Sequence, residues 1–259
     1  GAAPEPRVRL LPPQNDLSSS RTFTQGIRRA LLEARAPFVA VNDCDDVPMP
    51  HRLERQAALL GDRPDVVLVG SWYDNIDAQG RLIVSHRLPS GHQDLIDLYQ
   101  HRNALAHSSL MYRRDAALAA GGYRERFTYA SDFALQVAMA ANGGKVAVVP
   151  EVLTRIRLHE AQTSLMPGRR AQAYREPLEI HGAASRLPGV SVRARVAGML
   201  TRQKLALRCG FALWAEGSRF ESLVRTPWWL LAPVASLFTS VSAVGQRNGR
   251  RREAAGGAT

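Results

Sequence analysis

A cluster of carboxylates follows one apolar segment of the chain. Residues 41–46 read VNDCDD, directly after an apolar run, so that Asp43, Asp45 and Asp46 lie within four positions. Two carboxylates about 4 Å apart repel by roughly 4 kcal/mol at an effective dielectric constant of about 20. A bound cation, a metal-bound nucleotide or solvent has to offset this repulsion. The three residues therefore predict either a metal site or a set of caps for the helix that follows.

The segments around this cluster alternate between helical and extended patterns. Residues 22–34 and 51–60 carry apolar side chains at helical spacing, whereas residues 38–41 and 66–69 are continuous apolar runs typical of strands buried on both faces. This alternation predicts an α/β domain with a mainly parallel sheet flanked by helices. Ligands bind at the carboxyl ends of the strands in such sheets, and VNDCDD lies at one of those ends.

Further elements are predicted along the rest of the chain. The patterns favour a strand at residues 8–11, a hairpin turn at 77–80, short helices at 93–99 and 115–120, a strand at 108–112, a helix at 131–141 that ends at Asn142-Gly143-Gly144, and two strands at 146–149 and 153–158. Arginine-rich helical patterns follow, from residue 166 to about Arg208.

The basic character of the chain belongs to its C-terminal third. The 259 residues carry a net charge of +11, but residues 1–165 hold 19 Lys and Arg against 18 Asp and Glu, whereas residues 166–259 hold 15 against 5. A basic segment of this kind can contact nucleic acid or anionic lipid. Cys44 and Cys209 lie far apart and make no disulfide framework, which favours a reducing compartment.

One segment of the C-terminal third has the composition of a membrane-associated element. Residues 226–246 contain no charged side chain, include Trp228 and Trp229, and have arginines on both sides. The segment is just long enough to cross a bilayer, but Pro233 and five Ser and Thr suit an anchor at the membrane interface equally well. The alternative is a helix that packs against the rest of the protein.

Three segments of the sequence together resemble the family 2 glycosyltransferases, which are inverting enzymes of the GT-A fold. GIRRALLEARAPFVAVNDCDDVPMPHRLERQAALLGDRPDVVLVGS is similar to that family's helix, strand, Asp-x-Asp, helix and strand. AHSSLMYRRDAALAAGGYRERFTYASDFALQVAMAANG is similar to its acceptor-side segment, and VPEVLTRIRLHEAQTS to its closing strand and His-containing loop. A lone Asp-x-Asp is a weak signal, whereas three segments in this order between about Val8 and Ser164 are specific.

The resemblance implies a nucleotide-sugar donor and a divalent metal, Mg²⁺ or Mn²⁺, that neutralises the departing diphosphate. It places Asp43 near the ribose and Asp45 on the metal, while Asp46 starts the following loop. Asp132 stands where the family has its catalytic base, which deprotonates an acceptor hydroxyl. The alternative for Asp132 is an interaction with the positive end of its own helix.

Three further residues fall in motifs of the family. Ser131 replaces the first acid of the usual Glu-Asp or Asp-Asp pair and is of a type that caps helices. His159, in RLHEAQTS, resembles the His of a His-x-x-Gln-x-Ser loop, where it completes the metal shell or contacts the diphosphate. His107 falls in the family's acceptor-side strand, and both His107 and Ser131 are candidates for contact with the acceptor. A structural role is the alternative for each histidine.

The family's first strand-helix-strand portion, which grips the nucleotide base, has no counterpart before the polar loop at Gln14. We therefore expect residues 1–165 to form a GT-A-like domain without those strands, and residues 166–259 to form a basic helical extension. For these 259 residues alone we expect weak or no activity.

The sequence thus predicts a metal-dependent inverting glycosyltransferase for cell-surface polysaccharide or glycolipid synthesis. Its partners would be a nucleotide-sugar donor, a glycan or lipid-linked acceptor and a membrane surface, with no nucleic acid. The expected location is the cytoplasm, at the inner face of the cell membrane. The alternatives are an inactive fragment, a basic non-enzymatic binding protein, and a nucleotidyltransferase, for which a Gly-rich phosphate loop is missing.

Overall fold

The computed structural model describes Leu11, residues 20–159 and residues 170–215. In this part of the chain, six strands form one sheet in the order β1-β5-β3-β6-β2, with β4 paired to β3. The strands are β1 (Phe38–Ala40), β2 (Val47–Pro48), β3 (Val66–Ile76), β4 (Leu82–His86), β5 (Met111–Arg113) and β6 (Lys145–Arg157). The helices are α1 (Ser20–Glu33), α2 (Arg52–Asp62), α3 (His92–Leu98), α4 (Arg114–Ala119), α5 (Ser131–Ala141), α6 (Arg170–Ala184) and α7 (Val192–Ala215), with a 3-10 turn η1 (His107–Ser109).

The strand pairing corrects the expectation of a mainly parallel sheet. β3 and β6 run parallel, but β1 with β5, β5 with β3, β3 with β4, and β6 with β2 are antiparallel. The α/β class and the flanking helices are confirmed, whereas the sheet is mixed. The predicted turn at residues 77–80, where Gly80 has φ +84°, joins β3 to β4, and so short a connection can only join antiparallel strands.

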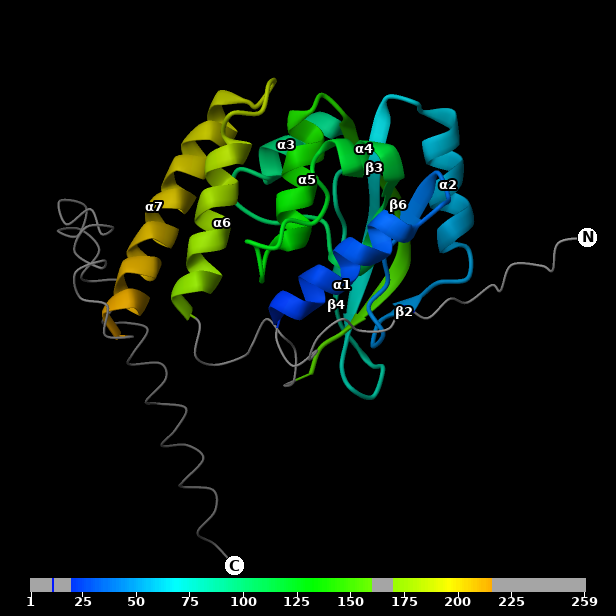
Figure 1. Ribbon diagram of the computed structural model, residues 1–259, viewed down its shortest axis with the longest axis horizontal. Coiled ribbons are helices and arrows are strands. Elements are labelled where there is room, and N and C mark those ends of the chain that lie inside the picture. The colour runs from blue at the N-terminus through cyan, green and yellow to red at the C-terminus, as the bar shows by residue number, and fades with distance from the viewer. Residues whose placement is uncertain (1–10, 12–19, 160–169, 216–259) are drawn as a thin grey trace, which may run out of the picture.

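The apolar runs of the central strands divide their side chains between two faces of the sheet. Leu68 belongs to the larger buried cluster and its neighbour Val69 to the smaller one, and Val146 and Ala147 of β6 divide in the same way. α2 covers the smaller cluster through Leu60. The other helices lie on the opposite side of the sheet from α2 (Figure 1).

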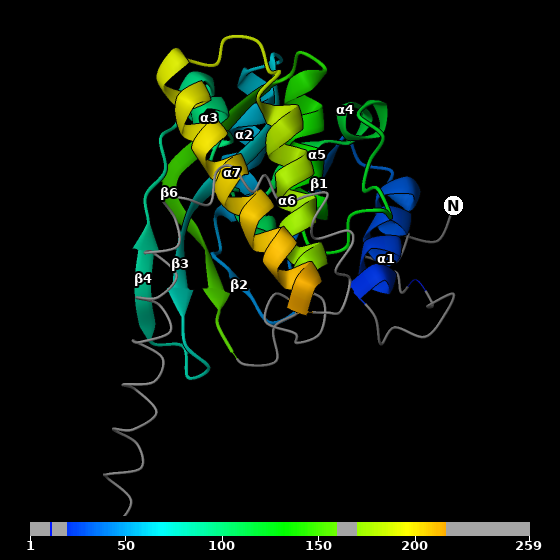
Figure 2. The same ribbon diagram turned by 90° about the vertical axis from the view of Figure 1, so that its left-hand side faces the viewer.

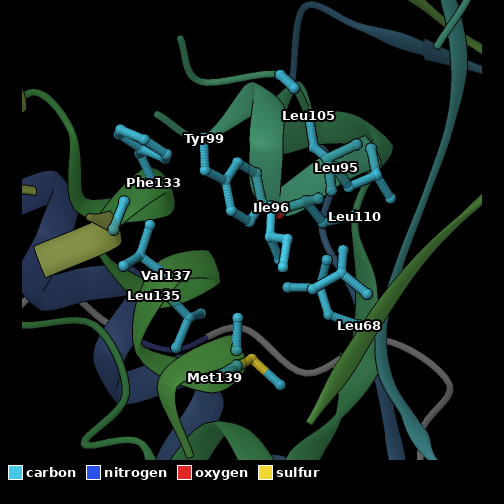
Figure 3. Close-up of a cluster of buried hydrophobic side chains, with 14 of the residues drawn as sticks. Leu68, Leu95, Ile96, Tyr99, Leu105, Leu110, Phe133, Leu135, Val137 and Met139 are labelled. Atoms are coloured by element: carbon cyan, nitrogen blue, oxygen red, sulfur yellow. The ribbon is translucent and has the colours of Figure 1, made fainter. Parts of the chain in front are cut away.

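The larger cluster continues beneath the C-terminal helices. Tyr99 and Phe133 pack edge to face within it, with ring centroids 5.6 Å apart (Figure 3). Ile180 of α6 and Ala194 of α7 are buried in the same cluster. α6 and α7 lie side by side, beyond α5 as seen from the sheet (Figures 1 and 2). The boundary expected after residue 165 falls among residues that the structure does not describe and stays a prediction.

β6 is one strand where the sequence predicts two. Its register with β3 moves from Ser71↔Val149 to Trp72↔Val152, so that Pro150 and Glu151 pass without a partner in β3. Because proline has no N–H to donate, this bulge lets the strand continue through Pro150.

Other predicted bounds change less. The strand predicted at residues 66–69 extends to Ile76, and the strand predicted at 108–112 becomes η1 followed by β5. The predicted strand at 8–11 and the segment 226–246 lie outside the described residues, apart from Leu11.

A buried arginine joins α2 to the end of β1. Arg52 is 1% exposed, and its guanidinium donates to the carbonyls of Val41 at 2.7 Å and Leu110 at 3.0 Å and to Gln56 Oε1 at 3.1 Å. Burial lowers the pKa of Arg52 to about 10, although the charge of Asp46 acts in the opposite direction. These bonds fix the backbone immediately before residues 43–46, which carry Asp43, Asp45 and Asp46 and are called the acidic turn or acidic segment below.

We predict that Arg52→Met lowers the free energy of unfolding by about 3 kcal/mol, because each buried acceptor left without a donor costs about 1–3 kcal/mol. Urea unfolding followed by circular dichroism measures the change. Arg55→Met is the matched control: its side chain is 57% exposed and pairs with Glu151 at 3.5 Å, so solvent screening keeps its effect below about 1 kcal/mol. Equal effects of the two substitutions would contradict the prediction.

Candidate active site

The acidic segment forms a turn at the carboxyl end of β1. The N–H of Asp46 donates to the carbonyl of Asp43 at 3.2 Å, and the side-chain amide of Asn42 donates to the same carbonyl at 2.7 Å. α2 begins only at Arg52, and its N-cap, His51, has no side-chain capping bond. The alternative in which these carboxylates cap the next helix is therefore wrong.

Asp43 is held by two residues of η1. Its N–H donates to Ser108 Oγ at 3.0 Å, and its Oδ1 lies 3.5 Å from His107 Nδ1. The other ring nitrogen of His107, Nε2, lies 3.0 Å from the hydroxyl of Tyr123. The hydroxyl of Tyr112 in turn donates to that of Tyr123 at 3.3 Å. The imidazole of His107 thus connects Asp43 to a buried pair of tyrosines.

The same contacts shift two pKa values in opposite directions. Burial lowers the pKa of His107, but the bond to Asp43 and the charges of Asp132, Asp43 and Asp46 outweigh it and hold the pKa above 6.5. Burial raises the pKa of Asp43, but its bonds to His107 and Ser108 outweigh it and hold the pKa below 3.8. The charge of Asp132, at the start of α5, thus acts on the same imidazole as that of Asp43.

Asp45 faces the end of β6. Its Oδ2 lies 2.8 Å from His159 Nε2, and both side chains are partly exposed. Arg157 fixes the turn from the same strand, because its N–H donates to Asp46 Oδ1 at 2.9 Å and its Nε donates to the carbonyl of Asp45 at 3.1 Å. Burial is the largest influence on Asp46, whose pKa is raised, and the charges of Asp45 and Asp43 act in the same direction.

Asp132 lies in the first turn of α5. Its Oδ2 accepts a hydrogen bond from the side-chain amide of Asn103 at 2.8 Å. The N-cap of α5 is Ala130, which has no side-chain capping bond. Ser131 is therefore the first residue of the helix, where it is buried, and the expectation that it caps the helix is wrong.

The sequence model of the family described as "Glycosyltransferase like family 2" matches residues 1–175. The chain belongs to this family. The amylovoran biosynthesis glycosyltransferase AmsE of Erwinia amylovora is 28% identical over 148 residues, which are 57% of this chain and 53% of the relative. The O-antigen biosynthesis glycosyltransferase WbnJ of Escherichia coli is 27% identical over 135 residues, 52% of each chain. The chain spans about half the length of the curated relatives that it matches.

A solved structure shows the same fold. Residues 1–349 of TarS from S. aureus, in complex with UDP-GlcNAc, superpose with a TM-score of 0.50 over 70% of this chain and 51% of that chain, at 12% identity. The GT-A fold expected for a family 2 glycosyltransferase is thereby confirmed.

Asp45 and His159 are of the residue types that bind divalent cations. Within the described residues, no group of three or more His, Cys, Asp and Glu side chains could hold a metal by itself. Asp45 and His159 offer an oxygen and a nitrogen 2.8 Å apart. Neighbouring ligands of an octahedral ion with bonds of about 2.1 Å lie roughly 3 Å apart, and an ion bound to phosphates needs only one or two protein ligands.

Sequence reasoning missed two side chains that support the candidate site. Asn103 gave no signal, because it lies in a loop and meets Asp132 only in the folded chain. Arg52 had a signal in its spacing: Arg52 and Gln56 share the buried face of α2 with Leu60, whereas Leu53 is 58% exposed. Polar residues at helical spacing with a buried leucine can thus indicate a buried polar network.

We predict that His107 titrates above pH 6.5 and that Asp43→Asn lowers its pKa. The substitution removes one of the carboxylates that raise the pKa of His107, whereas burial still lowers it. Because the pKa of His107 is raised and that of Asp43 is lowered, the pair stabilises the fold fully between about pH 3.8 and pH 6.5. This contribution is lost as the pH rises through the folded-state pKa of His107 or falls through that of Asp43. NMR titration of the imidazole signals measures both values. His92, whose pKa burial lowers, is the internal control. A pKa of His107 that does not respond to Asp43→Asn would contradict the assignment.

Proposed function

We propose that this protein transfers a sugar from a nucleoside-diphosphate donor to a hydroxyl acceptor, with inversion at the anomeric carbon. Family membership supports the transferase class. The observation that carries the proposal is that one short segment contacts both carboxylate residues: the N–H of Asp43 donates to Ser108 Oγ at 3.0 Å, and the amide of Asn103 donates to Asp132 Oδ2 at 2.8 Å. The proposed donor-side and base-side carboxylates thus both border residues 103–108, which supports a single displacement between two bound substrates.

On the donor side, Asp43 would face the ribose, and Asp45 with His159 would hold Mg²⁺ or Mn²⁺. A cation bound there would neutralise the charge of the departing diphosphate. Arg157 would support this role, because its Nε donates to the carbonyl of Asp45 and fixes the backbone of the turn. In this proposal Asp43 contacts the nucleotide, Asp45 binds the metal, and Asp46 supports the turn.

On the acceptor side, Asp132 would remove the proton from the acceptor hydroxyl. The hydroxyl oxygen attacks the anomeric carbon while the bond from that carbon to the diphosphate oxygen breaks, and the electron pair leaves with the nucleoside diphosphate. The amide of Asn103 donates to Asp132 Oδ2, which leaves Oδ1 as the oxygen that takes the proton. His107 and Ser131 would line this side.

The names of relatives support one product class. The names of two of them refer to amylovoran and O-antigen biosynthesis. We therefore place this protein in the synthesis of a cell-surface polysaccharide or glycolipid, with a glycan or a lipid-linked glycan as acceptor. In this proposal residues 1–165 carry the chemistry, and residues 166–259 form the basic extension.

A peripheral contact with an anionic membrane surface is part of the proposal. Among the residues that the structure describes, no helix has both the length and the apolar character needed to cross a bilayer. α7 supports a surface contact instead, because it carries five Lys and Arg and no Asp or Glu. The side of α7 away from the core exposes the apolar residues Val192, Val196, Met199 and Leu200, with Arg193 and Lys204 beside them. Anionic lipid complements such a helix.

We predict that Asp132→Asn lowers kcat by about 10²- to 10⁴-fold, the usual contribution of a positioned base. The complete product of the gene would be screened against nucleotide sugars with Mg²⁺ or Mn²⁺, with a chelator in a parallel reaction, and release of nucleoside diphosphate would be measured. Asp115→Asn is the matched control, because Asp115 is an exposed acid in the first turn of α4. An Asp132→Asn variant with more than about a tenth of the wild-type kcat would argue against a base at this position.

We predict that the protein sediments with vesicles that contain phosphatidylglycerol, and less with vesicles of phosphatidylcholine alone, because basic residues near an anionic surface contribute about 1 kcal/mol each. Val196→Glu with Leu200→Glu should abolish the difference. Leu82→Glu with Ile83→Glu is the control, because these residues are an exposed apolar pair on β4. Equal sedimentation of both double variants would remove α7 as the contact surface.

A further inference from the structure

α6 inserts one carboxylate into the segment that leads to α5. Glu176 is 4% exposed. Its Oε1 accepts from the backbone N–H of Thr128 at 2.9 Å, and its Oε2 accepts from those of Tyr129 at 2.7 Å and Ala130 at 3.0 Å. Three consecutive backbone donors are thus satisfied by a single side chain, and charge makes such bonds stronger than neutral ones.

Neighbouring contacts fix both this carboxylate and the segment. Gln172, one turn earlier in α6, donates to Glu176 Oε1 at 2.9 Å and to Thr128 Oγ1 at 3.1 Å. From the other side, Thr24 Oγ1 of α1 donates to the carbonyl of Phe127 at 3.1 Å. Residues 127–130 are therefore held between α1 and α6, immediately before Ser131 and Asp132.

A second contact from α6 lies just after Asp132. The ring of His181 packs edge to face on Phe133, with centroids 5.1 Å apart. His181 Nδ1 also lies 2.8 Å from the carbonyl of Tyr99, whose own ring packs on Phe133. α6 thus contacts the chain directly before and directly after Ser131-Asp132.

We infer that Glu176 is a positioning residue for the base Asp132, so that α6, which lies outside residues 1–165, supports the residues that carry the chemistry. The inference rests on the proposed role of Asp132. The remainder of α5 is anchored by Leu135, Val137 and Met139 in the core. Loss of Glu176 therefore frees residues 128–130 and the first turn of α5, which contains Asp132, while the rest of the helix stays in place. A shift of about 1 Å at a reacting group can lower a rate by about 10²-fold.

The test compares Glu176→Ala and Glu176→Gln with Glu179→Gln. Glu179 lies on the same helix and pairs at 2.7 Å with Arg126, the residue directly before residues 127–130, and both side chains of this ion pair are exposed. We expect Glu176→Ala to lower kcat about 10- to 100-fold with little change in the donor KM, because the donor side is built from other elements. Glu176→Gln, which keeps the shape but sets an amide N–H against a backbone N–H, should lower kcat about three- to tenfold. Glu179→Gln should stay within about twofold.

Combination with Asp132→Asn separates positioning from a general structural role. If Glu176 acts through Asp132, Glu176→Ala lowers the residual rate of the Asp132→Asn protein by less than about twofold. A further loss of about tenfold in that background, or a loss of kcat in Glu179→Gln as large as in Glu176→Ala, would overturn the inference. Should Glu176→Ala fail to fold, Glu176→Gln carries the same comparison.

Hydrogen exchange distinguishes failure of this inference from failure of the proposed function. If no donor is used by the wild-type protein, the proposed function fails, but the amides of residues 128–130 still report on the contact. We expect them to exchange at least about tenfold faster in the Glu176 variants and at the wild-type rate in Glu179→Gln. Unchanged exchange in the Glu176 variants would overturn the inference whatever the activity.

Discussion

The arrangement of the site depends on one buried guanidinium. Arg52 binds the carbonyls at the end of β1 and before β5, so it holds together the two segments that carry Asp43 and His107. Its positive charge also lies close enough to Asp46 for the two to interact. The guanidinium also donates to Asn42 Oδ1 at 3.2 Å, so it holds the residue directly before Asp43 as well.

The mixed sheet explains why the candidate residues meet. The turn after β1, the end of β6, η1 and the start of α5 each carry one part of the site, and they are separated by long stretches of chain. β6 brings Arg157 and His159 to the acidic turn because β2, which follows that turn, pairs with β6 through Val47↔Arg155. The short strand β2, which is easily overlooked, thus fixes the donor side of the site.

The sequence predicted the local elements well, because the signals for them are local. Continuous apolar runs marked β3 and β6, and Gly80 marked a turn that its positive φ requires. Strand direction could not be predicted in the same way, since a buried strand has the same composition in a parallel and an antiparallel pair. The prediction that Ser131 caps its helix was also wrong. Serine is a common capping residue, but the backbone N–H groups directly before Ser131 donate to Glu176, which belongs to a helix distant in sequence. The side-chain carboxylates of Asp43, Asp45 and Asp132 contact His107, His159 and Asn103, which are all distant in sequence, so no local pattern could identify these partners.

The parallel pairing of β3 with β6 also constrains the order in which the protein can fold. Val66 pairs with Lys145 and Ile76 with Arg157, so the chain must close a long loop that contains β4, β5 and three helices before this pairing forms. Closing such a loop has an entropic cost that local helices and hairpins do not have, and contacts of this range form slowly. Hairpin β3–β4 and the helices can therefore form early, whereas the acidic turn, which β6 holds in place, reaches its final position only when the centre of the sheet closes.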